Sequence, residues 1–198
     1  MPSSYNTEKK IFYARDRKTW RRWLLKNFEK ENNIWLKLYK KHSDTPCIVY
    51  AEAVEETLCF GWIDSKPNKV DEESFVLFFS KRKAKSPWSA INKKRVEILI
   101  ATGMMTQAGL NKIEEAKKDG SWDLLNSIDN LEIPDDLEKE FRKNKIAAKH
   151  FHAFSPSARK SILWWITSAK TKETRNKRIK ETITLAAQNK VANQYVRK

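Results

Sequence analysis

The segment from Phe75 to Phe79 consists of five consecutive large apolar residues and therefore has no polar face. In a half-exposed strand apolar and polar side chains alternate, because successive side chains point to opposite faces of the sheet. A strand without this alternation is typical of a position that is covered on both sides. The segment therefore predicts a strand in the centre of a sheet with cover on both faces. The rest of the chain must supply the neighbouring strands and the elements that cover the two faces.

Two further segments of the first half have strand character. Apolar side chains alternate with more polar ones over residues 33–40, which predicts a strand with one buried face. Residues 62–66 and 75–80 flank a polar loop, and this arrangement predicts an antiparallel hairpin with a long connection. Apolar side chains at helical spacing predict a helix over 16–29, and good helix formers predict another over 51–58.

From residue 86 onward, apolar residues recur only at helical spacing. The pairs Ser86-Pro87 and Ser155-Pro156 place a capping side chain before a proline, which is a pattern that begins helices. The helix after Ser155 has the clearest buried stripe, which includes Trp165. The predicted helices of this half begin at Ser86, Thr106, Pro134, Ser155 and Thr171.

These patterns predict an α+β fold with two domains. Residues 8–102 are expected to form a small mixed or antiparallel sheet with helices, and residues 103–198 an all-helical domain. The longest apolar runs are far shorter than the roughly 20 residues of a membrane-spanning helix, and no apolar stretch follows the first basic residues, as it would in a secretory signal. We therefore expect a cytoplasmic protein without a transmembrane segment.

Three separated strings resemble one known family. They are AEAVEETLCFGWIDS at residues 51–65, SPWSAIN at 86–92 and AKTKETRNKRI at 169–179. In this order they resemble the YdeI/OmpD-associated family, also called the bacteriocin-protection family. The resemblance spans nearly the whole chain, and residues from about 135 to 189 resemble the helical module that defines the family. The first half also looks distantly like the YdhG-like α/β domain.

The family resemblance implies a role at the level of the bacterial envelope. It implies a small bacterial protein linked to outer-membrane porin association and to resistance against bacteriocins or cationic antimicrobial peptides. It implies no catalytic residue and no cofactor.

A run of cations precedes the helix that Ser86 is expected to begin. Lys81, Arg82, Lys83 and Lys85 fall within five positions, and a helix N-terminus adds free N–H groups and partial positive charge. The run predicts a site for a phosphate, a nucleotide or a nucleic-acid backbone, with stacking and clamping groups further along the helix; a solvated turn is the alternative. The candidate ligand-binding residues are Trp62, Asp64, Lys81, Arg82, Lys83, Ser86, Trp88 and Arg95.

Asp64 is the one carboxylate in this candidate set. In a pocket beside Arg82 or Lys66 it could orient a polar ligand, and in a cleft it could act as the acid or base of an enzyme on a small anionic substrate. A cap or a salt bridge within the fold is the structural alternative.

The C-terminal part of the chain is strongly basic within a protein of net charge +15. Residues 155–198 contain eleven cations, Arg197 and Lys198 among them, and two carboxylates. Such a surface attracts nucleic acid or another anion without reading sequence, and its binding should be sensitive to salt. A solvated helix face is the alternative. The candidate basic surface comprises Lys170, Lys172, Arg175, Lys177 and Arg178.

The function that these observations favour is a non-enzymatic binding module linked to envelope stress or cationic-peptide resistance. It would bind an anionic ligand or a protein partner in a groove between the two halves. Non-specific nucleic-acid binding and an enzyme that uses Asp64 are the alternatives. A metal site is not expected, because His150 and His152 have no cysteine or carboxylate at zinc-ligand spacing.

Overall fold

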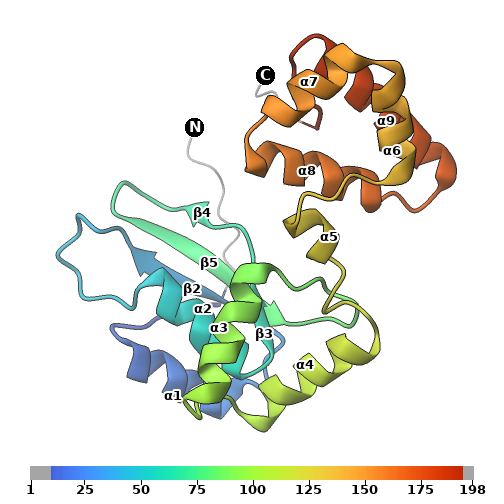
Figure 1. Cartoon of the computed structure of the whole chain (residues 1–198). Helices are drawn as coiled ribbons and strands as arrows, with labels where there is room; N and C mark the ends of the chain where they lie inside the picture. Colours follow the sequence, from blue (N-terminus) through green and yellow to red (C-terminus); the bar gives the residue numbers. More distant parts are fainter. Residues whose placement is uncertain (1–9, 194–198) are drawn as a thin grey trace. The chain divides into compact units, whose positions relative to one another are not determined.

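The computed structural model describes residues 10–193, and the chain forms two compact units that divide between Asp123 and Leu124 (Figure 1). The predicted α+β class is confirmed, because the first unit combines a sheet with helices and the second is helical. The predicted domain start at residue 8 and the cations Arg197 and Lys198 lie outside the described residues.

The elements of the first unit are β1 (Ile11–Tyr13), α1 (Arg17–Asn27), β2 (Asn33–Tyr39), α2 (Tyr50–Cys59), β3 (Trp62–Asp64), β4 (Asn68–Lys69), β5 (Ser74–Lys81), α3 (Ala90–Ala101) and α4 (Gln107–Lys118). The elements of the second unit are α5 (Asn126–Asp129), α6 (Asp135–Lys143), α7 (Lys145–Ala153), α8 (Pro156–Thr167) and α9 (Lys172–Ala187).

The apolar strand β5 lies in the interior of the sheet, as predicted. The strand order is β1-β2-β5-β3, with β4 also paired to β5. The predicted hairpin is confirmed, because β3 and β4 both run antiparallel to β5. The sheet is mixed because β1, which the sequence patterns did not reveal, runs parallel to β2.

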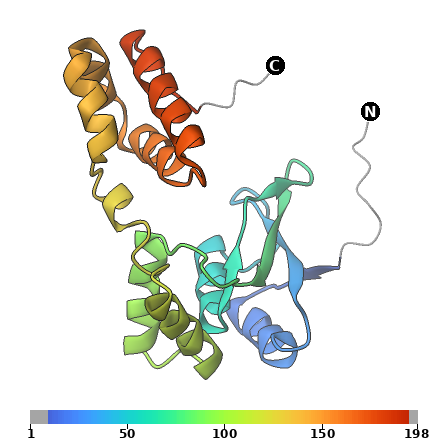
Figure 2. The same ribbon diagram turned by 90° about the vertical axis from the view of Figure 1, so that its right-hand side faces the viewer.

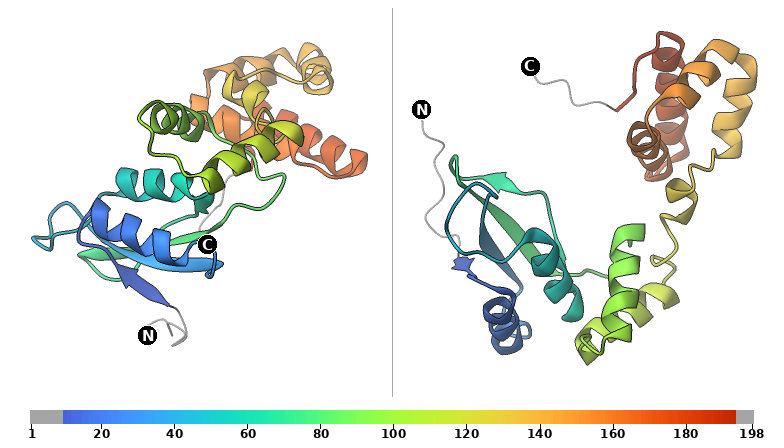
Figure 3. Two further views of the ribbon diagram at one scale, coloured as in Figure 1. Left: turned by 90° about the horizontal axis from the view of Figure 1, so that it is seen from below. Right: turned by 60° about the vertical axis from the view of Figure 1, so that its left-hand side comes forward.

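The two faces of β5 have different surroundings. Phe79 is fully buried beneath α1, with its ring centroid 5.6 Å from that of Trp20, and α1 and α2 lie together on this face (Figure 3). Phe78 points to the opposite face, where it is only half-buried and lies 5.0 Å from Trp35. The prediction of full cover on both faces is therefore wrong for Phe78, whose neighbour is an aromatic side chain of the same sheet.

The helix α4 packs against the end of α2 through a close backbone contact. A Cβ built on Gly109 would lie 2.4 Å from the carbonyl oxygen of Cys59, so only glycine fits there. The hydroxyl of Thr106 also donates to this oxygen, at 2.6 Å. The sequence patterns place the domain boundary between residues 102 and 103. The compact units divide after Asp123, and this contact joins α4 to α2 within the first unit.

The predicted helix start at Ser86 and Pro87 is wrong. The helix α3 begins only after Ser89, whose Oγ accepts a hydrogen bond from the backbone N–H of Asn92 at 3.3 Å. Ser86 and Pro87 remain in a loop, where the carbonyl oxygen of Pro87 accepts a hydrogen bond from Arg82 at 3.1 Å. The predicted helix starts at Thr106, Ser155 and Thr171 are confirmed, because each of these side chains accepts a hydrogen bond from a backbone N–H three residues later and so caps a helix.

The second unit packs its helices around a separate core, with α9 in contact with α6, α7 and α8 (Figure 2). The helix predicted at Pro134 ends at Asn144, whose side chain caps a further helix, α7, at 3.0 Å. On α8, Ile162 and Ile166 are fully buried as predicted. Trp165 is half-buried instead, and the guanidinium of Arg178 lies over its ring, 5.2 Å from the ring centre.

A buried ion-pair network joins α1 to α2 and generates the first prediction. Glu56 has no exposed side-chain surface, and its two carboxylate oxygens contact Arg17 at 2.6 Å and Arg21 at 2.8 Å. Glu56→Ala is expected to lower the free energy of unfolding of the first unit by about 2–4 kcal/mol, because Arg17 and Arg21 lose the buried carboxylate that they share. Urea denaturation followed by tryptophan fluorescence measures this change.

The control for this variant is Glu55→Gln. Glu55 is more exposed and contacts only Arg17, at 3.0 Å, so its loss is expected to cost less than about 1 kcal/mol. Equal losses in the two variants would contradict the assignment of the network to Glu56.

Candidate functional site

The cations of the predicted anion-binding loop point in different directions. The ammonium of Lys81 donates to the carbonyl oxygen of Glu29 at 2.8 Å, and Lys83 is exposed. Arg82 turns into the protein, with only 4% of its surface exposed, and its guanidinium lies 3.8 Å from the ring centre of Trp88. A run that looks uniform in sequence therefore has one buried cation between two outward ones.

Four of the predicted ligand-binding residues line one small cavity of about 10 Å³. They are Arg82, Lys83, Ser86 and Trp88. Asp119, at the end of α4, lies in the same lining and accepts a hydrogen bond from the backbone N–H of Lys85 at 2.9 Å. The cavity therefore lies between the loop and α4, and it has room for about one water molecule.

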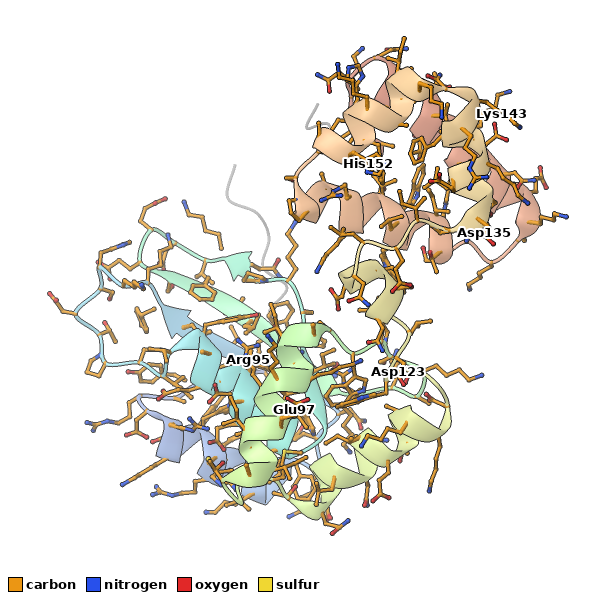
Figure 4. The ribbon with its side chains drawn as sticks, viewed as in Figure 1. Arg95, Glu97, Asp123, Asp135, Lys143 and His152 are labelled. Atoms are coloured by element: carbon orange, nitrogen blue, oxygen red, sulfur yellow. The ribbon has the colours of Figure 1, made fainter. Side chains whose placement is uncertain are left out.

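The other predicted residues do not line this cavity. Asp64 accepts a hydrogen bond from the hydroxyl of Tyr50 at 2.7 Å. Burial raises the pKa of Tyr50 to about 12, and the hydrogen bond to Asp64 is the second-largest cause of this rise. Arg95 projects from α3 (Figure 4) and donates to the side chain of Asn92 at 3.0 Å. Trp62 is buried in the core, edge-on to Trp23.

The predicted basic surface of the second unit separates into two kinds of cation. Arg175 pairs with Asp136, and Arg178 donates to the carbonyl oxygen of Trp165, so both arginines hold helices together. The three lysines are exposed to solvent, namely Lys170, Lys172 and Lys177.

A groove with a volume of about 910 Å³ lies between α6 and α9 in the second unit. We call it the α6–α9 groove. Asp135 and Lys143 lie at the two ends of α6 (Figure 4). The groove is lined by Asp136, Lys139, Glu140, Arg142 and Lys143 of α6 and by Asn176, Ile179, Lys180, Ile183 and Thr184 of α9. Sequence analysis missed it, although the spacing of three and four residues within each set is that of a single helix face.

The α6–α9 groove combines an apolar base with lysines that lack a carboxylate partner in the described part of the chain. Ile179 is buried and Ile183 half-buried at its base. Glu140 is engaged by Lys143 at 2.6 Å. In contrast, no carboxylate of residues 10–193 lies within ion-pair distance of the ammonium groups of Lys139 and Lys180. The groove thus offers apolar contact and uncompensated positive charge together.

A two-point ion pair holds the walls of the α6–α9 groove together. Arg175 of α9 donates to both carboxylate oxygens of Asp136 on α6, at 2.5 and 2.9 Å. These hydrogen bonds hold the pKa of Asp136 below its usual range, because they stabilise the charged form. The geometry of the groove therefore depends on a carboxylate that must stay ionised.

Asp136→Asn is the second prediction. The pKa of Asp136 is lower in the folded than in the unfolded state, so its stabilising effect is complete above the unfolded value of about 3.9 and is lost as the pH falls towards the folded value. Because the pair is partly exposed, the variant is expected to lose only about 0.5–1 kcal/mol at neutral pH. Urea denaturation followed by far-UV circular dichroism at pH 7 and pH 3 should show this difference shrinking in acid.

Asp135→Asn is the matched control, because Asp135 lies in the same first helical turn and is exposed. It shares any interaction with the helix dipole but has no arginine partner among the described residues. An equal pH dependence in both variants would contradict a specific effect of Arg175.

Two features are absent from residues 10–193. No helix in this range is long and apolar enough to cross a bilayer. No three His, Cys, Asp or Glu side chains of the same range are grouped so that they could hold a metal ion.

Comparison with known proteins gives one family match in each half of the chain. The model of a family described as Domain of unknown function (DUF8412) matches residues 12–112. The model of a family described as Bacteriocin-protection, YdeI or OmpD-Associated matches residues 130–189. No curated protein and no solved structure matches the chain. The second match covers α6 to α9 and with them the whole α6–α9 groove, and it supports the resemblance seen in the sequence; the first family was not anticipated.

Proposed function

We propose a binding function for this chain, which belongs to the family described as Domain of unknown function (DUF8412) and carries a domain of the Bacteriocin-protection, YdeI or OmpD-Associated family. The match to the second family supports a role of the bacteriocin-protection or OmpD-associated type at the level of the family. Our proposal is more specific: the chain is a non-enzymatic module that binds an acidic segment of a protein partner in the α6–α9 groove. We keep the cytoplasm as its expected compartment.

The observation that carries this proposal is that the α6–α9 groove combines an apolar base with two lysines that form no ion pair with a carboxylate of residues 10–193. Lys139 of α6 and Lys180 of α9 line the groove from its two helices, and Ile183 of α9 belongs to the same lining. A segment with apolar side chains on one side and carboxylates beside them would bury its apolar surface and pair with both ammonium groups. A volume of about 910 Å³ is in the range of sites that bind ligands of substantial size.

The sign of the charge argues against direct capture of a cationic peptide. The chain carries net charge +15, and the groove lining contains four cations and two carboxylates, both engaged in ion pairs. A cationic peptide would be repelled at long range and in contact. Any role in protection against such peptides would therefore act through an anionic partner.

Nucleic acid is the alternative partner that the sequence leaves open. A sugar-phosphate backbone would satisfy the lysines through counterion release, but it has no apolar group to cover the isoleucines at the base. The groove therefore favours a protein segment.

The third prediction tests this binding function. A labelled amphipathic helical peptide of Leu and Glu is expected to bind the full chain in fluorescence anisotropy, whereas its Gln counterpart binds more weakly. Lys139→Glu with Lys180→Glu is expected to weaken binding of the acidic peptide at least about tenfold, since two attractive contacts become repulsive.

The matched control is Lys94→Glu with Lys118→Glu, which makes the same change in net charge at exposed lysines of the first unit. Its affinity should stay within about threefold of the unaltered chain. Equal weakening by both double variants would refute the groove as the binding surface. Tight binding of duplex DNA without binding of the peptide would replace the proposed partner by nucleic acid.

A further inference from the structure

Arg82 is a buried cation without a carboxylate partner in the described part of the chain. Only 4% of the residue is exposed, and no ion pair joins it to an acid. Asp64 is the carboxylate whose field it feels, but that group accepts its hydrogen bond from Tyr50. Burial lowers the pKa of Arg82 to about 10, so the guanidinium remains charged at neutral pH. A buried charge of this kind is costly unless something compensates it.

The hydrogen bonds of Arg82 use only one side of its guanidinium. Nη1 donates to the carbonyl oxygen of Pro87 at 3.1 Å and, at the limit of hydrogen-bond distance, to that of Ser86 at 3.5 Å. Nε and Nη2 are buried without a partner among residues 10–193. These two nitrogens form the side edge of the guanidinium, which donates two parallel hydrogen bonds to the two oxygens of a carboxylate or phosphate.

The ring beneath Arg82 adds another donor of the same kind. The Nε1–H of Trp88 is buried and unpartnered, and so is that of Trp62 on β3, which adjoins the strand that leads into Arg82. Four of the five buried side-chain atoms without a partner in the described residues come from these three side chains, and all four are donors. At the cavity itself the unpartnered donors are those of Arg82 and Trp88, and a donor excess beside a positive charge favours an acceptor that is itself negative.

The lining of the cavity beside Arg82 is also predominantly positive. Its lining includes the cations Lys83, Lys85 and Lys112. Its two carboxylates are engaged, because Glu115 pairs with Lys112 at 2.7 Å and Asp119 accepts from backbone N–H groups. At about 10 Å³ the cavity admits one water-sized group, so a larger ligand enters only if the loop from Lys83 to Ser86 moves outward.

From this geometry we infer that the side edge of Arg82, above the ring of Trp88, is a binding site for an oxyanion group, either a carboxylate or a phosphate. The site lies in the first unit and is independent of the α6–α9 groove. The Nε and Nη2 groups hold two oxygens of the ligand, and Trp88 supports the guanidinium from below. The exposed Lys83 attracts the anion without holding it.

The experiment is a titration of the full chain with inorganic phosphate and, separately, with acetate at constant ionic strength. The signals followed are the Arg82 Nε–H and the indole N–H of Trp88 in ¹H–¹⁵N spectra. At least one of the two anions is expected to shift both signals to saturation. Arg82→Lys keeps the positive charge but removes the two-donor edge, and it should weaken the affinity at least about tenfold as read from the Trp88 signal.

Two further variants keep the inference testable if Arg82→Lys does not fold. Trp88→Phe retains the ring beneath the guanidinium and removes one donor, so it should preserve the Arg82 shift with an affinity reduced by less than about tenfold. Lys83→Gln, on the same loop, should change the affinity less than about threefold. The absence of saturable shifts with both anions would overturn the inference and leave water as the acceptor. So would equal weakening by Lys83→Gln and Arg82→Lys, because that result would indicate a diffuse response to charge.

Discussion

The burial of β5 is the constraint on which the first unit depends. Fully burying a side chain such as Phe79 contributes about 1.5–3 kcal/mol, more than most exposed ion pairs, and this burial requires α1 with Trp20 above it. The strand also fixes the position of the next residue in the chain. The backbone N–H of Arg82 bonds to the carbonyl oxygen of Gly61 at 3.0 Å and extends the ladder by one residue beyond Lys81. The hydrogen bonding of the sheet thus holds the backbone of Arg82, whose side chain is buried.

Several arginines and lysines of the chain have different roles, and the difference follows from their chemistry. Arginine forms planar, two-point hydrogen bonds at low hydration cost, whereas lysine is a strongly hydrated point charge. In the first unit Arg17 and Arg21 hold the buried Glu56, and in the second Arg175 joins α9 to α6. The lysines of α9 remain at the surface, and they are therefore the cations that a partner can reach.

Much of the fold could be predicted from local patterns. The central position of β5, the β3–β5 hairpin and the helix starts at Thr106, Ser155 and Thr171 could be predicted from spacing or from the residue before a helix. The predictions that failed depend on distant residues. Ser86 has the pattern of a cap but remains in a loop whose carbonyl groups contact Arg82. The close contact of Gly109 with Cys59, which joins α4 to α2, is also set by residues far apart in the sequence. The strand β1 has only three residues, too few to show a period.

For the candidate sites, the sequence by itself determined which cations the chain carries and which segments are helical, because periodicity and capping are properties of neighbouring residues. It indicated that Lys81, Arg82 and Lys83 form a basic run, but only the tertiary structure decided that the middle one is buried. It placed Arg175 on a helix, but its pairing with Asp136 joins residues 39 positions apart. The groove between their helices exists only after both have packed, since burial and ion pairing depend on groups that the chain brings together from a distance.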